Sequence, residues 1–184
     1  MISYEEFEDI VVNTLKRNIS SNEDQKKAIS SDANDSLFIV AGPGSGKTTV
    51  IVLKILKYIF VDDIAPDEIL ATTFTRKAAN ELHSRILSWG DQIKNYLLEN
   101  IVEDDPIKEL ELMNFIEKKI DLNKINIGTT DSIAEDLLRI HREPGTNQPL
   151  VIEEFVTKSA MTNILLKDNR YLNENLKEYL KSFT

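Results

Sequence analysis

Hydrophobic residues recur along the chain at two spacings, which predict alternating helices and strands. Apolar positions three or four residues apart predict amphipathic helices over residues 3–18, 49–60, 76–89 and 131–141. Short apolar runs predict buried strands over residues 37–41, 69–73 and 124–129. A short helix over residues 23–30 follows the capping sequence Ser20-Ser21-Asn22. Because strands that alternate with helices form parallel sheets, the expected fold class is α/β, a parallel sheet flanked by helices.

The second half of the chain is predicted to be mostly helical. Gly90 is expected to end the helix that begins at Arg76, and acidic helical stretches follow over about 91–101 and 106–120. A loop over residues 143–149 precedes two further helical patterns, over about 151–167 and 171–182. We therefore expect one α/β domain over residues 1–140, followed by a helical segment over residues 141–184.

A glycine-rich loop lies between the first predicted strand and the next helix, Ala41-Gly42-Pro43-Gly44-Ser45-Gly46-Lys47-Thr48. Backbone N–H groups of such a loop surround phosphate, and the helix N-terminus adds a partial positive charge. Lys47 is expected to reach the outer phosphates of ATP, and the Thr48 hydroxyl to bind Mg²⁺. We call residues 41–48 the phosphate loop. Its predicted nucleotide ligands are Gly42, Gly44, Ser45, Gly46, Lys47 and Thr48, together with Thr49.

Nucleotide hydrolysis normally also requires an acidic residue at the end of a second buried strand, which no part of this chain clearly supplies. The pair Asp62-Asp63 follows an apolar run that comes too soon after Lys47 and should be helical. The pair Glu153-Glu154 lies on a helical apolar face, and the run before Glu103 is too short. We therefore expect the chain to be a fragment that binds ATP without hydrolysing it alone.

Composition limits the class of protein. The 184 residues are 41% hydrophobic and carry a formal net charge of −9, which argues against a free-standing nucleic-acid binder. No apolar run is long enough to cross a membrane, and no secretion signal is recognisable at Met1. The absence of cysteine excludes disulfides and thiolate metal sites. A cytoplasmic protein without a membrane partner is expected.

Other phosphate-loop proteins fit less well. A GTPase would carry Asn-Lys-x-Asp, but Asn126 stands where the Asp should follow Asn123-Lys124, and no Asp-x-x-Gly sequence exists. A small kinase would have an arginine-rich lid, and the basic residues here do not cluster in that way. A non-catalytic module that binds nucleotide or DNA remains an alternative.

Four segments in order resemble the N-terminal part of UvrD/Rep-like superfamily 1 DNA helicases. Residues 22–29 resemble the adenine-recognition element Leu-Asn-x-x-Gln-x-x-Ala-Val/Ile, with Ser21 in place of the leucine. The phosphate loop begins with Ala in that family too. Residues 73–82 resemble Thr-Phe-Thr-Asn-Lys-Ala-Ala-x-Glu-Met/Leu. Residues 127–132 resemble Ile/Val-Gly-Thr-Phe-His-Ser, and the whole resemblance covers about residues 20–140.

The resemblance implies specific roles for residues outside the phosphate loop. Gln25 would read the adenine edge with its side-chain amide, although its position alone would suit any exposed helical residue. Phe74 would stack on a base of single-stranded DNA, unless it is a buried core residue. Thr75 would bind a DNA phosphate, and it could cap the next helix as well.

The fourth segment departs from the family pattern. Thr130-Asp131 stands where Phe-His is usual, and an acid at that position would repel a DNA phosphate. Asp131 is instead expected to be the N-cap of the following helix. Thr129 and Ser132 remain the DNA-binding candidates of this segment.

The resemblance further implies a RecA-like phosphate-loop fold and an ATP-dependent helicase or translocase that moves 3′ to 5′ on single-stranded DNA. The implied partners are single-stranded DNA and the remainder of the helicase chain, including a second motor domain. The implied cofactors are ATP and Mg²⁺. Residues 141–184 would then begin an inserted helical subdomain.

Overall fold

The computed structural model describes residues 2–100, 110, 113, 114, 116, 120–141 and 145. The chain divides into two compact units, Met1–Ile133 and Ala134–Thr184. The described part of the second unit is the end of one helix, His141 and Gly145. No helix among the described residues is long and apolar enough to cross a membrane. All elements discussed below belong to the first unit, except the end of α6.

The N-terminal helix α1 (Tyr4–Leu15) begins with a capping box and packs through one apolar face. The Ser3 hydroxyl accepts a hydrogen bond from the Glu6 backbone, and the Glu6 carboxylate accepts one from the Ser3 backbone. Phe7 and Val11 on this face are fully buried. The helix ends at Lys16, whose φ of 54° is left-handed, so α1 is shorter than the predicted span 3–18.

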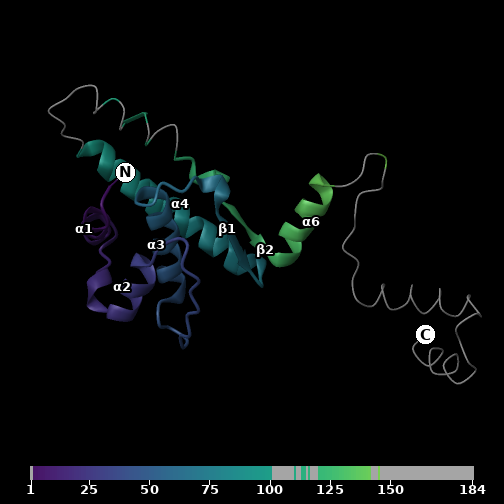
Figure 1. Cartoon of the computed structure of the whole chain (residues 1–184), viewed down its shortest axis with the longest axis horizontal. Coiled ribbons are helices and arrows are strands. Elements are labelled where there is room, and N and C mark those ends of the chain that lie inside the picture. Colours follow the sequence, from purple (N-terminus) through teal and green to yellow (C-terminus); the bar gives the residue numbers. More distant parts are fainter. Residues whose placement is uncertain are drawn as a thin grey trace, which may run out of the picture. The chain divides into compact units, whose positions relative to one another are not determined.

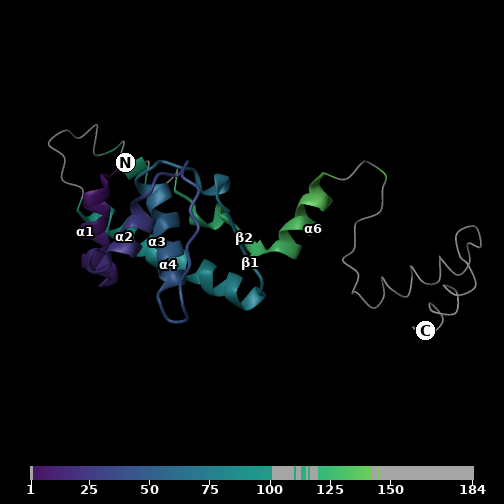
Figure 2. The same cartoon turned by 60° about the horizontal axis from the view of Figure 1, so that its bottom comes forward.

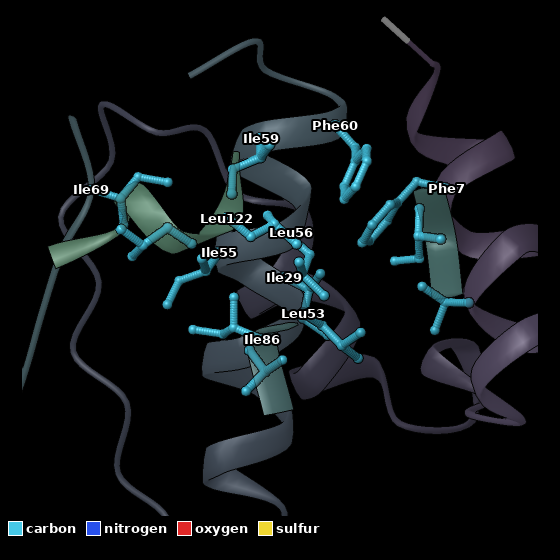
Figure 3. Packing of buried hydrophobic residues seen from close by; sticks show 14 of the residues in the cluster. Phe7, Ile29, Leu53, Ile55, Leu56, Ile59, Phe60, Ile69, Ile86 and Leu122 are labelled. Carbon is cyan, nitrogen blue, oxygen red and sulfur yellow. The ribbon is translucent and has the colours of Figure 1, made fainter. Parts of the chain in front are cut away.

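The next elements lead into α3, the central helix of the core. The short 3-10 helix η1 (Ile19–Ser21) precedes α2 (Glu23–Ser30), which Asn22 caps as the sequence predicts. Helix α3 (Lys47–Phe60) has eight buried residues, and Figure 1 and Figure 2 show α1 and α2 beside it. Figure 3 shows Phe7, Ile29 and Ile86 around the α3 residues Leu53 and Leu56. The core therefore supports the helix that carries Lys47 and Thr48.

Two lysines of α3 bind the C-terminal end of α2. The Lys54 ammonium donates to the Ala28 carbonyl at 2.9 Å, and the Lys57 ammonium donates to the Ser31 carbonyl at 3.2 Å. Cations stabilise the carbonyl end of a helix because that end carries a partial negative charge. Partial burial and the positive charge of Lys57 lower the pKa of Lys54. These contacts fix α2, and so Gln25, relative to α3.

A two-stranded parallel sheet lies further along the chain. Strand β1 (Leu70–Thr73) pairs with β2 (Asn126–Thr129), in a register that joins Leu70 to Asn126 and Thr73 to Thr129. The 3-10 helices η2 (Pro66–Glu68) and η4 (Leu122–Lys124) lead into these strands. Helix α4 (Arg76–Glu99) contacts both strands, and α6 (Thr130–Ile140) follows β2. The second and third predicted strands are therefore confirmed within one or two residues.

The first predicted strand, residues 37–41, is not a strand. Phe38 is 92% exposed and Val40 is 85% exposed. Among the described residues, β1 and β2 pair only with each other, so this segment has no partner for a hydrogen-bonded ladder. Its apolar composition alone cannot make a strand, because a strand needs the backbone hydrogen bonds of a neighbour.

Gly90 does not end helix α4, which continues to Glu99. A β-carbon at position 90 would lie 2.3 Å from Leu122 Cδ1 and 3.1 Å from Leu56 Cδ2. Gly90 therefore allows helix and loop to pack closely, and packing outweighs its low helix propensity. The predicted stretch 91–101 mostly continues α4. Most of the predicted stretch 106–120, and nearly all residues after 141, lie outside the described residues.

Candidate nucleotide-binding site

The phosphate loop adopts a conformation that requires glycine at two positions. Gly44 has a φ of 76° and Gly46 a φ of 82°, in the left-handed region that other residues rarely adopt. Gly46 is also the N-cap of α3 and has no side chain to bind the first N–H groups of the helix. The loop and the helix N-terminus together form the kind of backbone concavity that binds anions.

The two residues predicted to bind phosphate and Mg²⁺ begin helix α3. The Lys47 ammonium donates to the carbonyls of Ala41 at 2.9 Å and Gly42 at 2.6 Å, so its charge lies over the phosphate loop. The Ser45 hydroxyl also donates to the Gly42 carbonyl, at 2.8 Å. Thr48 lies in the first turn of α3 and is half-buried. Both side chains therefore lie where a phosphate loop requires them.

Gln25 contacts the phosphate loop directly. Its side-chain amide donates to the Ser45 carbonyl at 3.0 Å. A β-carbon at Gly46 would lie 3.1 Å from the same amide nitrogen, so the glycine also makes room for Gln25. One of the two amide N–H donors is used in this bond, which leaves a donor and the carbonyl acceptor for a base edge. The structure thus brings together two motifs that the sequence separates by twenty residues.

Two cavities adjoin this contact. The larger, about 530 Å³, is lined by residues 16–19, by Asn22 and Gln25, and by Gly44, Ser45, Gly46 and Thr49, with three further residues. The smaller, about 210 Å³, is lined by Lys47 and residues 39–41, and it shares Asn22, Gln25 and Ser45 with the larger one. Gln25 therefore borders both cavities.

Residues 16–19 of the larger cavity were not predicted as site residues. Arg17 lies with its guanidinium carbon 5.4 Å from the centre of the Trp89 ring on α4. Glu8 of α1 binds the Lys26 ammonium at 3.0 Å and accepts a hydrogen bond from the Ser20 hydroxyl. These contacts fix α1 against η1 and α2. No sequence motif marks Arg17, and only the tertiary structure brings it near Gln25.

The predicted DNA-binding residues after β1 are accessible. Phe74 is fully exposed between β1 and α4, so it is not the buried core residue that the sequence left open. Thr75 is the N-cap of α4, because its hydroxyl accepts a hydrogen bond from the Ala78 backbone at 3.2 Å. The capping role is confirmed, and the DNA-binding role of both residues stays a prediction.

Thr129 and Ser132 bind each other at the start of α6. The Thr129 hydroxyl donates to the Ser132 hydroxyl at 3.1 Å and accepts from the Ser132 backbone N–H at 3.2 Å. The prediction that Asp131 is the N-cap is therefore wrong: Thr129 performs this function, and Asp131 lies in the first turn of α6. A carboxylate in a first turn is still favourable because the helix N-terminus is partially positive.

The three acidic pairs that could imitate a second catalytic site have different outcomes. Residues 58–60 belong to α3, and Asp62 forms an ion pair with Lys57, as expected if this run is not a strand. The runs before Glu103 and Glu153 lie outside the described residues. Among the described residues, no three potential metal-binding side chains of the His, Cys, Asp and Glu types cluster together.

A glycine-rich loop that opens a helix next to an adenine-reading glutamine is the arrangement of a phosphate-loop NTPase. A sequence model of the UvrD/REP helicase N-terminal domain matches residues 21–183, and the chain therefore belongs to this family. The predicted resemblance is confirmed. Family membership implies the phosphate-loop NTPase fold, with which the parallel β1–β2 pair is consistent; a complete RecA-like sheet stays a prediction.

Individual relatives include named helicases. ATP-dependent DNA helicase Rep of Buchnera aphidicola is 39% identical over 122 residues, which are 66% of this chain and 17% of Rep. An ATP-dependent helicase/nuclease of Staphylococcus carnosus is 27% identical over 157 residues, 85% of this chain and 11% of that protein. ATP-dependent DNA helicase SRS2 of Saccharomyces cerevisiae is 42% identical over 65 residues, 35% of this chain and 6% of SRS2. The chain thus spans a small part of each relative's length.

Proposed function

We propose that this chain is the ATP-binding part of an ATP-dependent DNA helicase or translocase. The observation that carries the proposal is the 3.0 Å hydrogen bond from the Gln25 amide to the Ser45 carbonyl. It joins a side chain suited to an adenine edge to a loop suited to phosphates, so that one nucleotide could contact both. The names of the relatives, all ATP-dependent helicases, support the same function.

Each residue of the phosphate loop has a defined task in this proposal. The backbone N–H groups of Gly42, Gly44, Ser45 and Gly46 bind phosphate oxygens, with Thr49 beside them. Lys47 exchanges the carbonyls of Ala41 and Gly42 for the outer phosphates, and Thr48 binds Mg²⁺ through its hydroxyl. Bound ATP supplies a phosphoanhydride whose hydrolysis provides free energy for movement. Gln25 selects adenine over guanine because only adenine offers a donor next to N7.

Single-stranded DNA is the proposed macromolecular ligand of the complete protein. Phe74 stacks on a base, and its full exposure supports this role. Thr75 offers a hydroxyl at a helix N-terminus, where phosphate binds favourably. Thr129 and Ser132 are weaker candidates, because their hydroxyls already bind each other. Movement from 3′ to 5′ and a second motor domain remain implications of the family resemblance, and a cytoplasmic location stays a prediction.

We further propose that residues 1–184 alone bind ATP without hydrolysing it. Strands β1 and β2 end in Thr73 and Thr129, so neither described strand carries an acid at its end to orient water and hold Mg²⁺. A phosphoryl-transfer enzyme that lacks this acid and a stabilising arginine loses several orders of magnitude in rate. Binding needs only the phosphate loop, the start of α3 and Gln25.

The test is calorimetric titration of ADP into the wild type, Lys47→Ala and Lys27→Ala. Lys27 is an exposed lysine of α2 that borders neither cavity, and it serves as the matched control. We expect ADP binding by the wild type and the control, and much weaker binding by Lys47→Ala. Equal affinity of all three proteins, or no binding by the wild type, would contradict the proposal. Turnover of about 1 s⁻¹ or faster with oligothymidylate would contradict the lack of hydrolysis.

A further inference from the structure

We propose that Arg17, in the segment before the matched family region, stacks on the purine base of the bound nucleotide and that Trp89 positions it. This inference rests on the proposed nucleotide binding. The family match begins at residue 21, so residues 16–19 lie outside it although they line the larger cavity. The N-terminal segment would then add a wall to the nucleotide site.

The larger cavity is the one that suits the base and ribose. Its volume of about 530 Å³ lies within the usual range of roughly 300–1,000 Å³ for small-molecule sites, whereas the smaller cavity, about 210 Å³, lies below it. Gln25 borders both cavities, but Lys47 borders only the smaller one. A nucleotide whose outer phosphates lie near Lys47 would therefore extend its base past Gln25 into the larger cavity.

Arg17 is the residue of this wall whose charged group is not used in local capping. The Lys16 ammonium donates to the Asn13 carbonyl at 2.7 Å, at the C-terminal end of α1. The Asn18 side chain accepts a hydrogen bond from the Ser21 backbone at 3.1 Å and so caps η1. The Arg17 guanidinium instead lies against an aromatic ring. It is therefore the cation of this segment best suited to contact a ligand.

Trp89 gives the guanidinium a defined plane. The Arg17 guanidinium carbon lies 5.4 Å from the centre of the Trp89 ring, within the distance of a cation–π contact. A guanidinium is planar and has two faces, and with one face toward the indole the opposite face can receive a purine ring. Stacking of this kind does not read the base edge, so base selection would remain with Gln25.

The backbone around Arg17 is held by the fold. Lys16 ends α1 in a left-handed conformation, and Ile19 directly after the segment is buried. Glu8 binds both Ser20 and Lys26, so the segment between α1 and α2 is fixed at both ends. A wall that is already formed loses little conformational freedom when a ligand binds, which favours affinity.

The decisive experiment compares ADP, GDP and pyrophosphate by calorimetry in the wild type, Arg17→Gln, Arg17→Lys and Arg85→Gln. Arg85 is an α4 arginine outside both cavities, paired with Glu81, and it provides the matched control. We expect Arg17→Gln to weaken ADP and GDP about five- to tenfold by the same factor, as loss of a cation–π contact implies, and to leave pyrophosphate unchanged. Arg17→Lys should lose almost as much, because lysine lacks the planar face.

Trp89 provides a second readout, because it is the single tryptophan of the chain. We expect ADP to change Trp89 fluorescence in the wild type and pyrophosphate to leave it unchanged. In Arg17→Gln saturated with ADP, the change should be largely lost. A merely structural role of Arg17 would lower the melting temperature without separating ADP from pyrophosphate.

Each other outcome would overturn the inference in a recognisable way. If Arg17→Gln binds ADP as tightly as the wild type while Lys47→Ala does not, Arg17 is no ligand and the proposed function stands. If Arg17→Gln weakens pyrophosphate as much as ADP, or Arg17→Lys retains full affinity, Arg17 acts as a charge on phosphate rather than on the base. If the wild type binds none of the three ligands, the proposed function fails together with the inference.

Discussion

The side-chain amide of Gln25 donates a hydrogen bond to the backbone carbonyl of Ser45, with the nitrogen and oxygen 3.0 Å apart. This bond connects the first turn of α2 to the phosphate loop. Asn22 holds that turn by accepting a hydrogen bond from the Gln25 backbone at 3.0 Å. A change in the position of α2 would therefore be transmitted to the phosphate loop.

Replacement of Gln25 by Ala should remove the preference for ATP over GTP. A bidentate contact to a base is worth about 1–3 kcal/mol of discrimination, so we expect the preference to fall by about tenfold or more. Competition between ATP and GTP in a binding assay measures it. Gln92→Ala is the control, because Gln92 is an exposed glutamine that binds only Ser88 of its own helix. An unchanged preference in Gln25→Ala would exclude Gln25 as the adenine reader.

Three glycine replacements should separate backbone strain from steric contact in the phosphate loop. Gly46→Ala combines a left-handed φ with a β-carbon 3.1 Å from Gln25, and Gly44→Ala has the left-handed φ alone. Gly42 has neither feature. We expect Gly44→Ala to cost about 1 kcal/mol of unfolding free energy, Gly46→Ala more, and Gly42→Ala little. Urea unfolding gives the order, and a costly Gly42→Ala would contradict this account.

The ion pair between Lys57 and Asp62 should contribute to stability asymmetrically. Their charged atoms are 2.6 Å apart, and the Lys57 side chain is 6% exposed while that of Asp62 is 22% exposed. Asp62→Ala leaves a buried ammonium without its partner and should cost about 3 kcal/mol. Lys57→Met should cost less, because methionine fills the apolar space and water can reach Asp62.

Chemical unfolding of both variants measures this asymmetry. Glu81→Ala is the control, since the exposed pair of Glu81 and Arg85 should contribute less than about 1 kcal/mol. A larger loss in Lys57→Met than in Asp62→Ala would mean that packing of the lysine stem, rather than its charge, determines the stability.

Phe74 should matter for DNA binding and not for folding. Because Phe74 is fully exposed, Phe74→Leu in residues 1–184 should leave the unfolding free energy unchanged within about 0.5 kcal/mol. In the complete protein, the same change should weaken single-stranded DNA binding, since one stacked base contributes about 1–3 kcal/mol. Phe74→Trp is the control that keeps an aromatic face. Equal DNA affinity of Phe74→Leu and the wild type would exclude stacking.

Tyr4 should make the protein less stable at alkaline pH. Burial and the charges of Glu8 and Glu5 raise the pKa of Tyr4 from 10.0 to about 12, and its hydroxyl is buried without a hydrogen-bond partner among the described residues. Because the folded pKa exceeds the unfolded one, the contribution is fully present below pH 10 and is lost as the pH rises toward 12.

Tyr4→Phe should therefore show a smaller loss of stability between pH 10 and 12 than the wild type. At neutral pH it should be equally or more stable, because it removes a buried polar group without a partner among the described residues. Urea unfolding at about pH 8 and about pH 11 tests both expectations. A marked loss of stability at the lower pH would indicate a hydrogen bond to the Tyr4 hydroxyl.

Local sequence signals determined the short helices and the phosphate loop. Asn22 alone places the start of α2, because its side chain caps a backbone N–H three residues away. The glycines of the phosphate loop occupy left-handed positions that few other residues tolerate, so their role can be read without the fold. The family could also be recognised from motif order, since each motif occupies consecutive residues.

Contacts between distant residues decided the rest, because such contacts leave no local pattern. Residues 37–41 have the composition of a buried strand, but among the described residues no strand lies beside them to complete the ladder. Gly90 has the composition of a helix end, but the side chains of Leu56 and Leu122 occupy the space that a β-carbon would need. Arg17 reaches the cavity beside Gln25 only because α1 packs against α4 and Trp89 lies under its guanidinium. Each of these outcomes depends on where a second segment packs, and residue spacing along one segment does not encode that position.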